Sequence, residues 1–172
     1  MAIRTFLAVF SVFTLISPLL FAQNGTAAAL GTATAPTTAE IEALQATIKT
    51  FFETISDEAA GPQKGLEELL KNSPLLREEK DKTIQALSNN IREISRRFGA
   101  YLSFEPIGVK TIGRDLVILR YLYKCQDYPV VWYFTFYRPI SPTPAEGMTA
   151  RPWSLVYFYY DSNLNIQTWE KF

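Results

Sequence analysis

The fold is decided by the stretch LVILRYLYKCQDYPVVWYFTFYR, Leu116–Arg138. If the chain reverses at Asp127–Tyr128, Leu116–Cys125 and Val130–Arg138 pair so that one face is wholly apolar. On that face the expected partners are Cys125/Val130, Tyr123/Trp132, Tyr121/Phe134 and Leu119/Phe136. On the reverse face they are Lys124/Val131, Leu122/Tyr133, Arg120/Thr135 and Ile118/Tyr137. Because strand side chains alternate with period two, this pattern predicts an antiparallel hairpin with one buried face.

Three further segments with a period of two flank this hairpin. Tyr101–Ile112 precedes it, and Trp153–Tyr160 and Leu164–Glu170 follow it. Turn sequences separate neighbouring segments at Gly113-Arg114-Asp115 and at Asp161-Ser162-Asn163. Consecutive strands joined by short turns predict an antiparallel meander.

Helical periodicity dominates the preceding part of the chain. Thr37 is the expected N-cap of a first helix, with Glu40 completing a capping box. Its apolar stripe consists of Ile41, Leu44, Ile48, Phe51, Phe52 and Ile55. Gly61-Pro62 opens a second helix that Asn72-Ser73-Pro74 stops, and a third helix is expected over residues 77–98. Helices followed by strands predict an α+β fold, with about three helices packed on one face of a curved antiparallel sheet.

The first 22 residues have the order of an export signal. Arg4 precedes an apolar run, Pro18 breaks it, and Ala22 offers a small residue for cleavage. We therefore expect a signal peptide over residues 1–22, a flexible Ala/Thr/Gly linker over residues 23–36, and a secreted or periplasmic protein. The alternative is an uncleaved segment that tethers the protein to the membrane, because the apolar run is nearly long enough to span a bilayer.

The composition excludes several kinds of chemistry. Histidine is absent, which rules out Ser-His-Asp and Cys-His catalysis and leaves no plausible zinc, haem or copper site. We expect no cofactor and no metal. Lys and Arg number 17, as do Asp and Glu, and no basic cluster is present. This balance argues against nucleic acid, and against a membrane surface once the signal is removed.

Short structural motifs give the chain a family resemblance. They are GAY at 99–101, EPI at 105–107, LVILRY at 116–121, WYFTFYRP at 132–139 and WSLV at 153–156. They resemble small exported bacterial proteins of the nuclear transport factor 2-like (cystatin-like) superfamily. The resemblance covers residues 37–172 and implies one cone-shaped domain. It implies no single function, because that superfamily includes isomerases, dehydratases, ligand carriers and dimerisation modules.

The catalytic members of that superfamily provide a test of the enzyme hypothesis. Dehydratase-like members depend on a histidine, which this chain lacks. Isomerase-like chemistry needs a tyrosine beside a neutral acid and a carboxylate base. Only Glu105, with Tyr121 or Tyr123, offers such a combination inside a cone. We expect a non-catalytic protein, with a histidine-free isomerase-like enzyme as the remaining alternative.

Binding of a small apolar ligand in a cone pocket is the first non-catalytic hypothesis. The candidate lining residues are Phe51, Phe52, Glu105, Leu119, Tyr121, Tyr123, Trp132, Phe134 and Phe136. The competing interpretation is that these aromatic side chains fill a packed core.

Protein association is the second hypothesis, with a homodimer formed through the reverse face of the hairpin. The candidate interface residues are Ile118, Arg120, Leu122, Val131, Tyr133 and Tyr137. This face is too apolar to be left wholly in water, and such patches commonly mark interfaces. The competing interpretation is that the C-terminal residues or the proline-rich segment 139–152 cover it within one chain.

Overall fold

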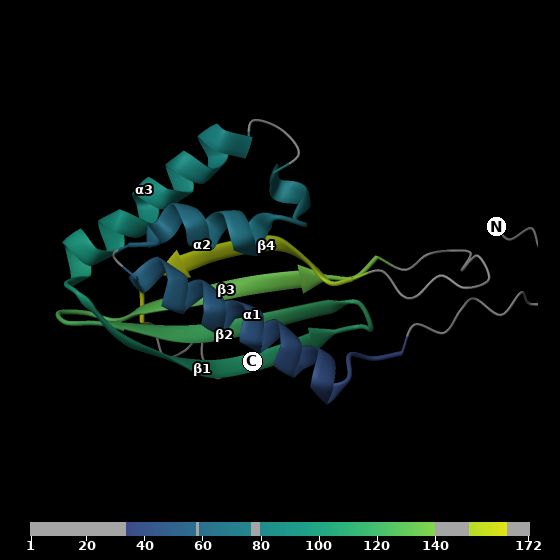
Figure 1. Cartoon of the computed structure of the whole chain (residues 1–172). Helices are drawn as coiled ribbons and strands as arrows, with labels where there is room; N and C mark the ends of the chain where they lie inside the picture. Colours follow the sequence, from purple (N-terminus) through teal and green to yellow (C-terminus); the bar gives the residue numbers. More distant parts are fainter. Residues whose placement is uncertain (1–33, 58, 77–79, 140–151, 165–172) are drawn as a thin grey trace, which may run out of the picture.

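The computed structural model describes residues 34–57, 59–76, 80–139 and 152–164. The elements are α1 (Thr38–Ser56), α2 (Gly61–Leu70), the short 3-10 helix η1 (Pro74–Leu76), α3 (Lys80–Phe98), β1 (Tyr101–Ile112), β2 (Leu116–Cys125), β3 (Val130–Tyr137) and β4 (Ser154–Asp161). The strands form one antiparallel sheet in the order β1-β2-β3-β4. The sheet is curved and the helices pack on one side of it (Figure 1), which confirms the predicted α+β architecture.

The predicted strand limits agree closely with the observed ones. β1 and β2 have the predicted bounds, and β3 and β4 differ from theirs by one residue. The predicted signal peptide, and all of the predicted fifth strand but Leu164, lie outside the described residues. Among the described helices, none is both long and apolar enough to cross a membrane.

The start of α1 follows the predicted capping box. Thr37 Oγ1 accepts a hydrogen bond from the Glu40 backbone N–H at 3.2 Å, and the Thr37 N–H donates to Glu40 Oε2 at 2.8 Å. These two bonds satisfy backbone donors that have no partner within the helix. The buried side chains of α1 are Leu44, Ile48, Phe51, Phe52 and Ile55. The predicted stripe is therefore the face that packs against the sheet.

The predicted register of the β2–β3 hairpin is wrong by two residues. The observed partners on the helix-covered face are Tyr123/Val130, Tyr121/Trp132, Leu119/Phe134 and Val117/Phe136. A shift of two leaves every side chain on its predicted face, because the strand period is also two. The expected separation into two faces therefore holds, although the cross-strand neighbours differ.

The cause of the shift is the connection between β2 and β3. The backbone N–H groups of Asp127 and Tyr128 donate to the carbonyl of Phe98 at 2.9 and 3.3 Å, and that of Gln126 donates to Ala100 at 2.9 Å. These donors therefore cap the end of α3 instead of closing a tight hairpin turn. The last β2 residue paired with β3 is consequently Tyr123 rather than Cys125.

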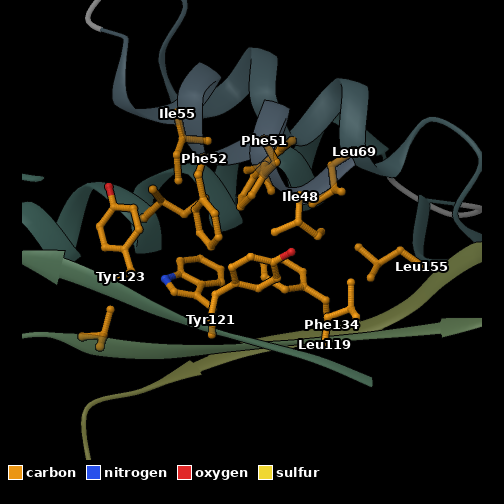
Figure 2. Packing of buried hydrophobic residues seen from close by; sticks show 14 of the residues in the cluster. Ile48, Phe51, Phe52, Ile55, Leu69, Leu119, Tyr121, Tyr123, Phe134 and Leu155 are labelled. Carbon is orange, nitrogen blue, oxygen red and sulfur yellow. The ribbon is translucent and has the colours of Figure 1, made fainter. Parts of the chain in front are cut away.

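The core lies between α1 and the helix-covered face of the sheet, as Figure 2 shows. The Phe52 ring is 5.5 Å from Tyr121 and 5.7 Å from Phe134, measured between ring centroids. α2 packs beside α1, and Gly65 permits the close approach, since a Cβ there would lie 2.6 Å from Ile55 Cγ2. α3 packs against α2 and completes the helical layer.

Candidate functional site

Eight of the nine predicted pocket residues lie in the core. They are Phe51, Phe52, Leu119, Tyr121, Tyr123, Trp132, Phe134 and Phe136, and each is at most 4% exposed. The six aromatic residues other than Phe136 have rings in contact with one another, and the rings of Trp132 and Phe134 stack at 5.8 Å. This arrangement gives them a packing role. Their role in ligand binding stays a prediction.

The ninth residue, Glu105, lies on the other side of the sheet. It is opposite Leu122, and cross-strand partners share a face, so it points away from the helices. Its carboxylate is 3.0 Å from Lys124 Nζ and 49% exposed. Burial meanwhile raises the pKa of Tyr121 and Tyr123 to about 12. The structure therefore separates the carboxylate from the phenols that the isomerase-like alternative requires.

The side of the sheet that none of the described helices covers, here called the outer face, has a regular arrangement of residues. Its cross-strand rows are Glu105/Leu122/Val131/Asp161, Gly108/Arg120/Tyr133/Tyr159, Lys110/Ile118/Thr135/Tyr157 and Ile112/Leu116/Tyr137/Ser154. All six predicted interface residues belong to these rows. The structure thus brings the predicted interface residues together on one face of the sheet, although Val131 and Arg120 are buried there, at 1% and 4% exposure.

Four tyrosines make up most of the exposed aromatic surface of this face. Tyr157 is 56% exposed, Tyr159 42% and Tyr137 36%, and Tyr133 is half-buried. Tyr133 and Tyr159 stack in parallel at 4.5 Å, and Tyr157 lies 5.5 Å from Tyr159. We call these four residues the tyrosine patch.

Two members of the patch were missed by the sequence-based prediction. Trp153–Tyr160 carries large apolar residues at both parities, so its own pattern does not say which of them face outward. Tyr157 and Tyr159 face outward because they pair with Thr135 and Tyr133 on β3. This pairing would have identified them, but it depends on the β3–β4 register.

A buried arginine, Arg120, lies opposite Tyr133 of the tyrosine patch on the neighbouring strand. Arg120 is only 4% exposed, and it packs against Gly108, where a Cβ would lie 3.1 Å from Nε. Burial and the neighbouring Tyr133 raise the pKa of Tyr159, although Arg120 partly opposes this. At neutral pH this phenol is therefore protonated, so its hydroxyl can both donate and accept hydrogen bonds.

A cleft on the helix side of the sheet is the second candidate site. It encloses about 450 Å³ between α1, α2, the end of β3 and the start of β4. Phe51 and Phe136 are the predicted pocket residues that line it. Among the residues with described positions, no three acidic or thiol side chains are grouped so as to hold a metal ion.

No family model, curated protein or solved structure matches this chain. The resemblance to the nuclear transport factor 2-like superfamily therefore stays a prediction. Function has to be inferred from the outer face and from the cleft themselves.

Proposed function

We propose that this protein is a secreted or periplasmic, non-catalytic interaction domain that forms a homodimer through its outer face. The observation that carries the proposal is the tyrosine patch, whose members Tyr157 and Tyr159 are about half exposed. Aromatic residues of this size are rarely gathered on a sheet face that only water covers.

The composition of the outer face favours association. Tyrosine and arginine are enriched at protein interfaces, and Lys and Glu are depleted there. The acidic Glu105 is already paired with Lys124, and the unlike charges of Lys110 and Asp161 lie at the margins, on β1 and β4. The centre of the face carries aromatic and aliphatic side chains together with the buried Arg120.

The size of the face also suits a dimer. Four strands about 4.8 Å apart, with eight residues rising about 3.3 Å each, span roughly 19 by 26 Å. This gives a flat footprint of about 500 Å², to which projecting side chains add accessible area. A standard interface buries about 800 Å² on each partner, so the outer face is large enough to supply most of one.

Pairing through the edge at β1 is less favourable than pairing through the face. Pro106 interrupts β1 and has no N–H to donate, and the strand bulges between Pro106 and Gly108 and near Tyr101. Proline and bulges are features that prevent edge-to-edge pairing of strands. Face-to-face packing is therefore the mode of association that we infer.

Charge favours one orientation of the second copy. A twofold axis along the strands would place Glu105 opposite Asp161 of the second copy, which brings like charges together. A twofold axis perpendicular to the strands, within the interface plane, instead places the row that contains Tyr159 over the row of the second copy that contains Tyr157. This orientation avoids the repulsion. We expect the second orientation.

Light scattering on the chain without residues 1–22, at micromolar concentration, tests the proposal. We expect the mass of a dimer. In the Tyr157→Lys variant the affinity of dimerisation should fall by roughly 100-fold, because the lysine charge would be buried in the interface. Tyr128→Lys is the matched control, since Tyr128 is 40% exposed but lies on the β2–β3 loop. It should leave the dimer intact.

A monomeric mass at tens of micromolar would contradict the proposal. The competing interpretation is that the C-terminal residues or segment 139–152 cover the outer face, and its first form makes its own prediction. In that case the complete C-terminus gives a monomer, and deletion of residues 165–172 produces a dimer that Tyr157→Lys dissociates.

A further inference from the structure

We propose that the cleft between α1, α2 and the start of β4 binds a small molecule that has an apolar body and an ammonium end. This site is independent of the dimer, because it lies on the helix side of the sheet. A volume of about 450 Å³ falls within the range of small-molecule pockets.

The apolar body is specified by the floor of the cleft. The floor consists of the buried side chains Leu44, Phe51, Leu69, Phe136 and Leu155. They come from α1, α2, β3 and β4, and Figure 2 shows Phe51, Leu69 and Leu155 converging. Because each is held by core packing, this surface is preformed, and covering it removes apolar area from water.

Trp153 supplies a wall that its surroundings hold in position. The Arg138 guanidinium lies 4.7 Å from the centre of the indole ring, and the indole N–H donates to Glu40 Oε1 at 3.4 Å. Arg138 is itself buried, pairs with Glu40, and donates to the Thr34 carbonyl at 3.0 Å. A ligand therefore meets an aromatic wall that is already ordered.

The polar lining from the helices accepts hydrogen bonds. The hydroxyls of Thr47 and Thr50 donate to the carbonyls of Ala43 and Ala46, at 3.0 and 3.1 Å. Only their lone pairs are left for a ligand. Glu68 adds a carboxylate, which also accepts. A ligand that satisfies this wall must bring donors.

The charged side chains around the cleft favour a cationic hydrogen-bond donor on the ligand over a neutral one. A second hollow, of about 290 Å³, shares Thr50 and Glu68 with the cleft. It adds the carboxylate of Asp57 and that of Glu53, which also pairs with Lys49 at 3.8 Å, and the ammonium of Lys64. Lys71 also lines the cleft, three residues after Glu68, so we expect the ammonium group on the side of Glu68 that Thr50 shares with the second hollow.

Three probes with a common apolar body test the inference on the whole chain. They are 4-phenylbutylamine, 4-phenylbutanol and 4-phenylbutyrate, titrated at neutral pH and low salt and followed by amide NMR shifts. We expect the amine to bind about fivefold more tightly than the alcohol, and the carboxylate to bind most weakly. The shifts should centre on residues of the cleft.

Two matched variants distinguish recognition of the ligand's charge from nonspecific hydrophobic binding. Glu68→Gln should abolish the preference for the amine over the alcohol. Glu67→Gln, one residue away and outside the cleft residues, should leave that preference unchanged. Thr47→Phe projects into the cleft from an exposed helix position and should weaken all three probes.

The inference is overturned by any of three results. One is the absence of cleft shifts for every probe at millimolar concentration. Another is tightest binding of the carboxylate. The last is a preference for the amine that persists unchanged in Glu68→Gln.

Discussion

The two faces of the sheet carry similar residues in different surroundings. On the helix-covered face, Trp132 and Phe134 stack and are buried beneath α1. On the outer face, Tyr133 and Tyr159 also stack, but their neighbour Tyr157 is more than half exposed. Tyr159 itself is 42% exposed, so ring stacking on the sheet does not require burial. The covering layer decides whether a ring stabilises the fold or is available to a partner.

The largest expected contrast between the faces is in folding stability. Phe52→Ala should lower the free energy of unfolding by about 3–5 kcal/mol, because a fully buried ring is lost and a cavity is left. Tyr157→Ala should change it by about 0.5 kcal/mol or less in the monomer. Urea unfolding at protein concentrations below dimer formation measures both values. Equal losses would mean that the outer face is also a structural core.

Two glycines sharpen the same comparison. Gly65→Ala should cost about 1–3 kcal/mol, because its Cβ would lie 2.6 Å from Ile55 Cγ2 and push α1 from α2. Gly108→Ala should cost less than about 1 kcal/mol, since its nearest contacts, at 3.1 Å, are atoms of the Arg120 side chain. Thermal unfolding compares the two variants. A larger loss for Gly108→Ala would show that the outer face is the more rigid one.

Acid should weaken the helix side of the molecule through Glu40. Hydrogen bonds from the backbone N–H and the side-chain hydroxyl of Thr37 lower the pKa of Glu40, and Trp153 and Arg138 act in the same direction. Because the pKa of Glu40 is lower in the folded state than in the unfolded state, the ionised carboxylate stabilises the fold at any pH above its unfolded-state pKa. This stabilisation is lost as the pH falls through the folded-state pKa. Unfolding free energies measured at successive pH values below about 5 should therefore decline less steeply in Glu40→Gln than in the unmodified chain. Identical slopes of unfolding free energy against pH in the two proteins would show that Glu40 does not contribute to the loss of stability in acid.

The smallest effect is expected at Glu105 on the outer face. Its pair with Lys124 is exposed on both sides, at 49% and 39%. Glu105→Gln should change the unfolding free energy by less than about 0.5 kcal/mol, and salt should reduce this difference further. Denaturation at low and high salt provides the measurement. A loss of several kcal/mol would indicate that the pair is buried by another part of the protein.

Local patterns explain what the residues alone could predict. The capping box of Thr37 and Glu40 and the period of two in β2 and β3 depend on side chains a few positions apart. Their consequences, the helix start and the division of side chains between faces, were predicted correctly for the same reason.

Long-range contacts explain what was missed. The register of β2 and β3 depends on hydrogen bonds from Asp127 and Tyr128 to the end of α3, and no pattern within the hairpin encodes them. The orientation of Glu105 depends on its alignment with Leu122, and β1 has bulges on either side of that pair. The cleft combines α1, α2, β3 and β4, so no single segment of sequence indicates it.

The amino-acid sequence by itself determined the order of the elements, the limits of the strands and the division of the hairpin into two faces. Propensity, capping and alternation act over a few residues, so they can be read directly from the chain. Only the tertiary structure decided the register of β2 and β3, which tyrosines stay exposed and where a cleft opens. Those outcomes depend on packing between segments far apart in the chain, because a side chain is buried only where another layer excludes water from it.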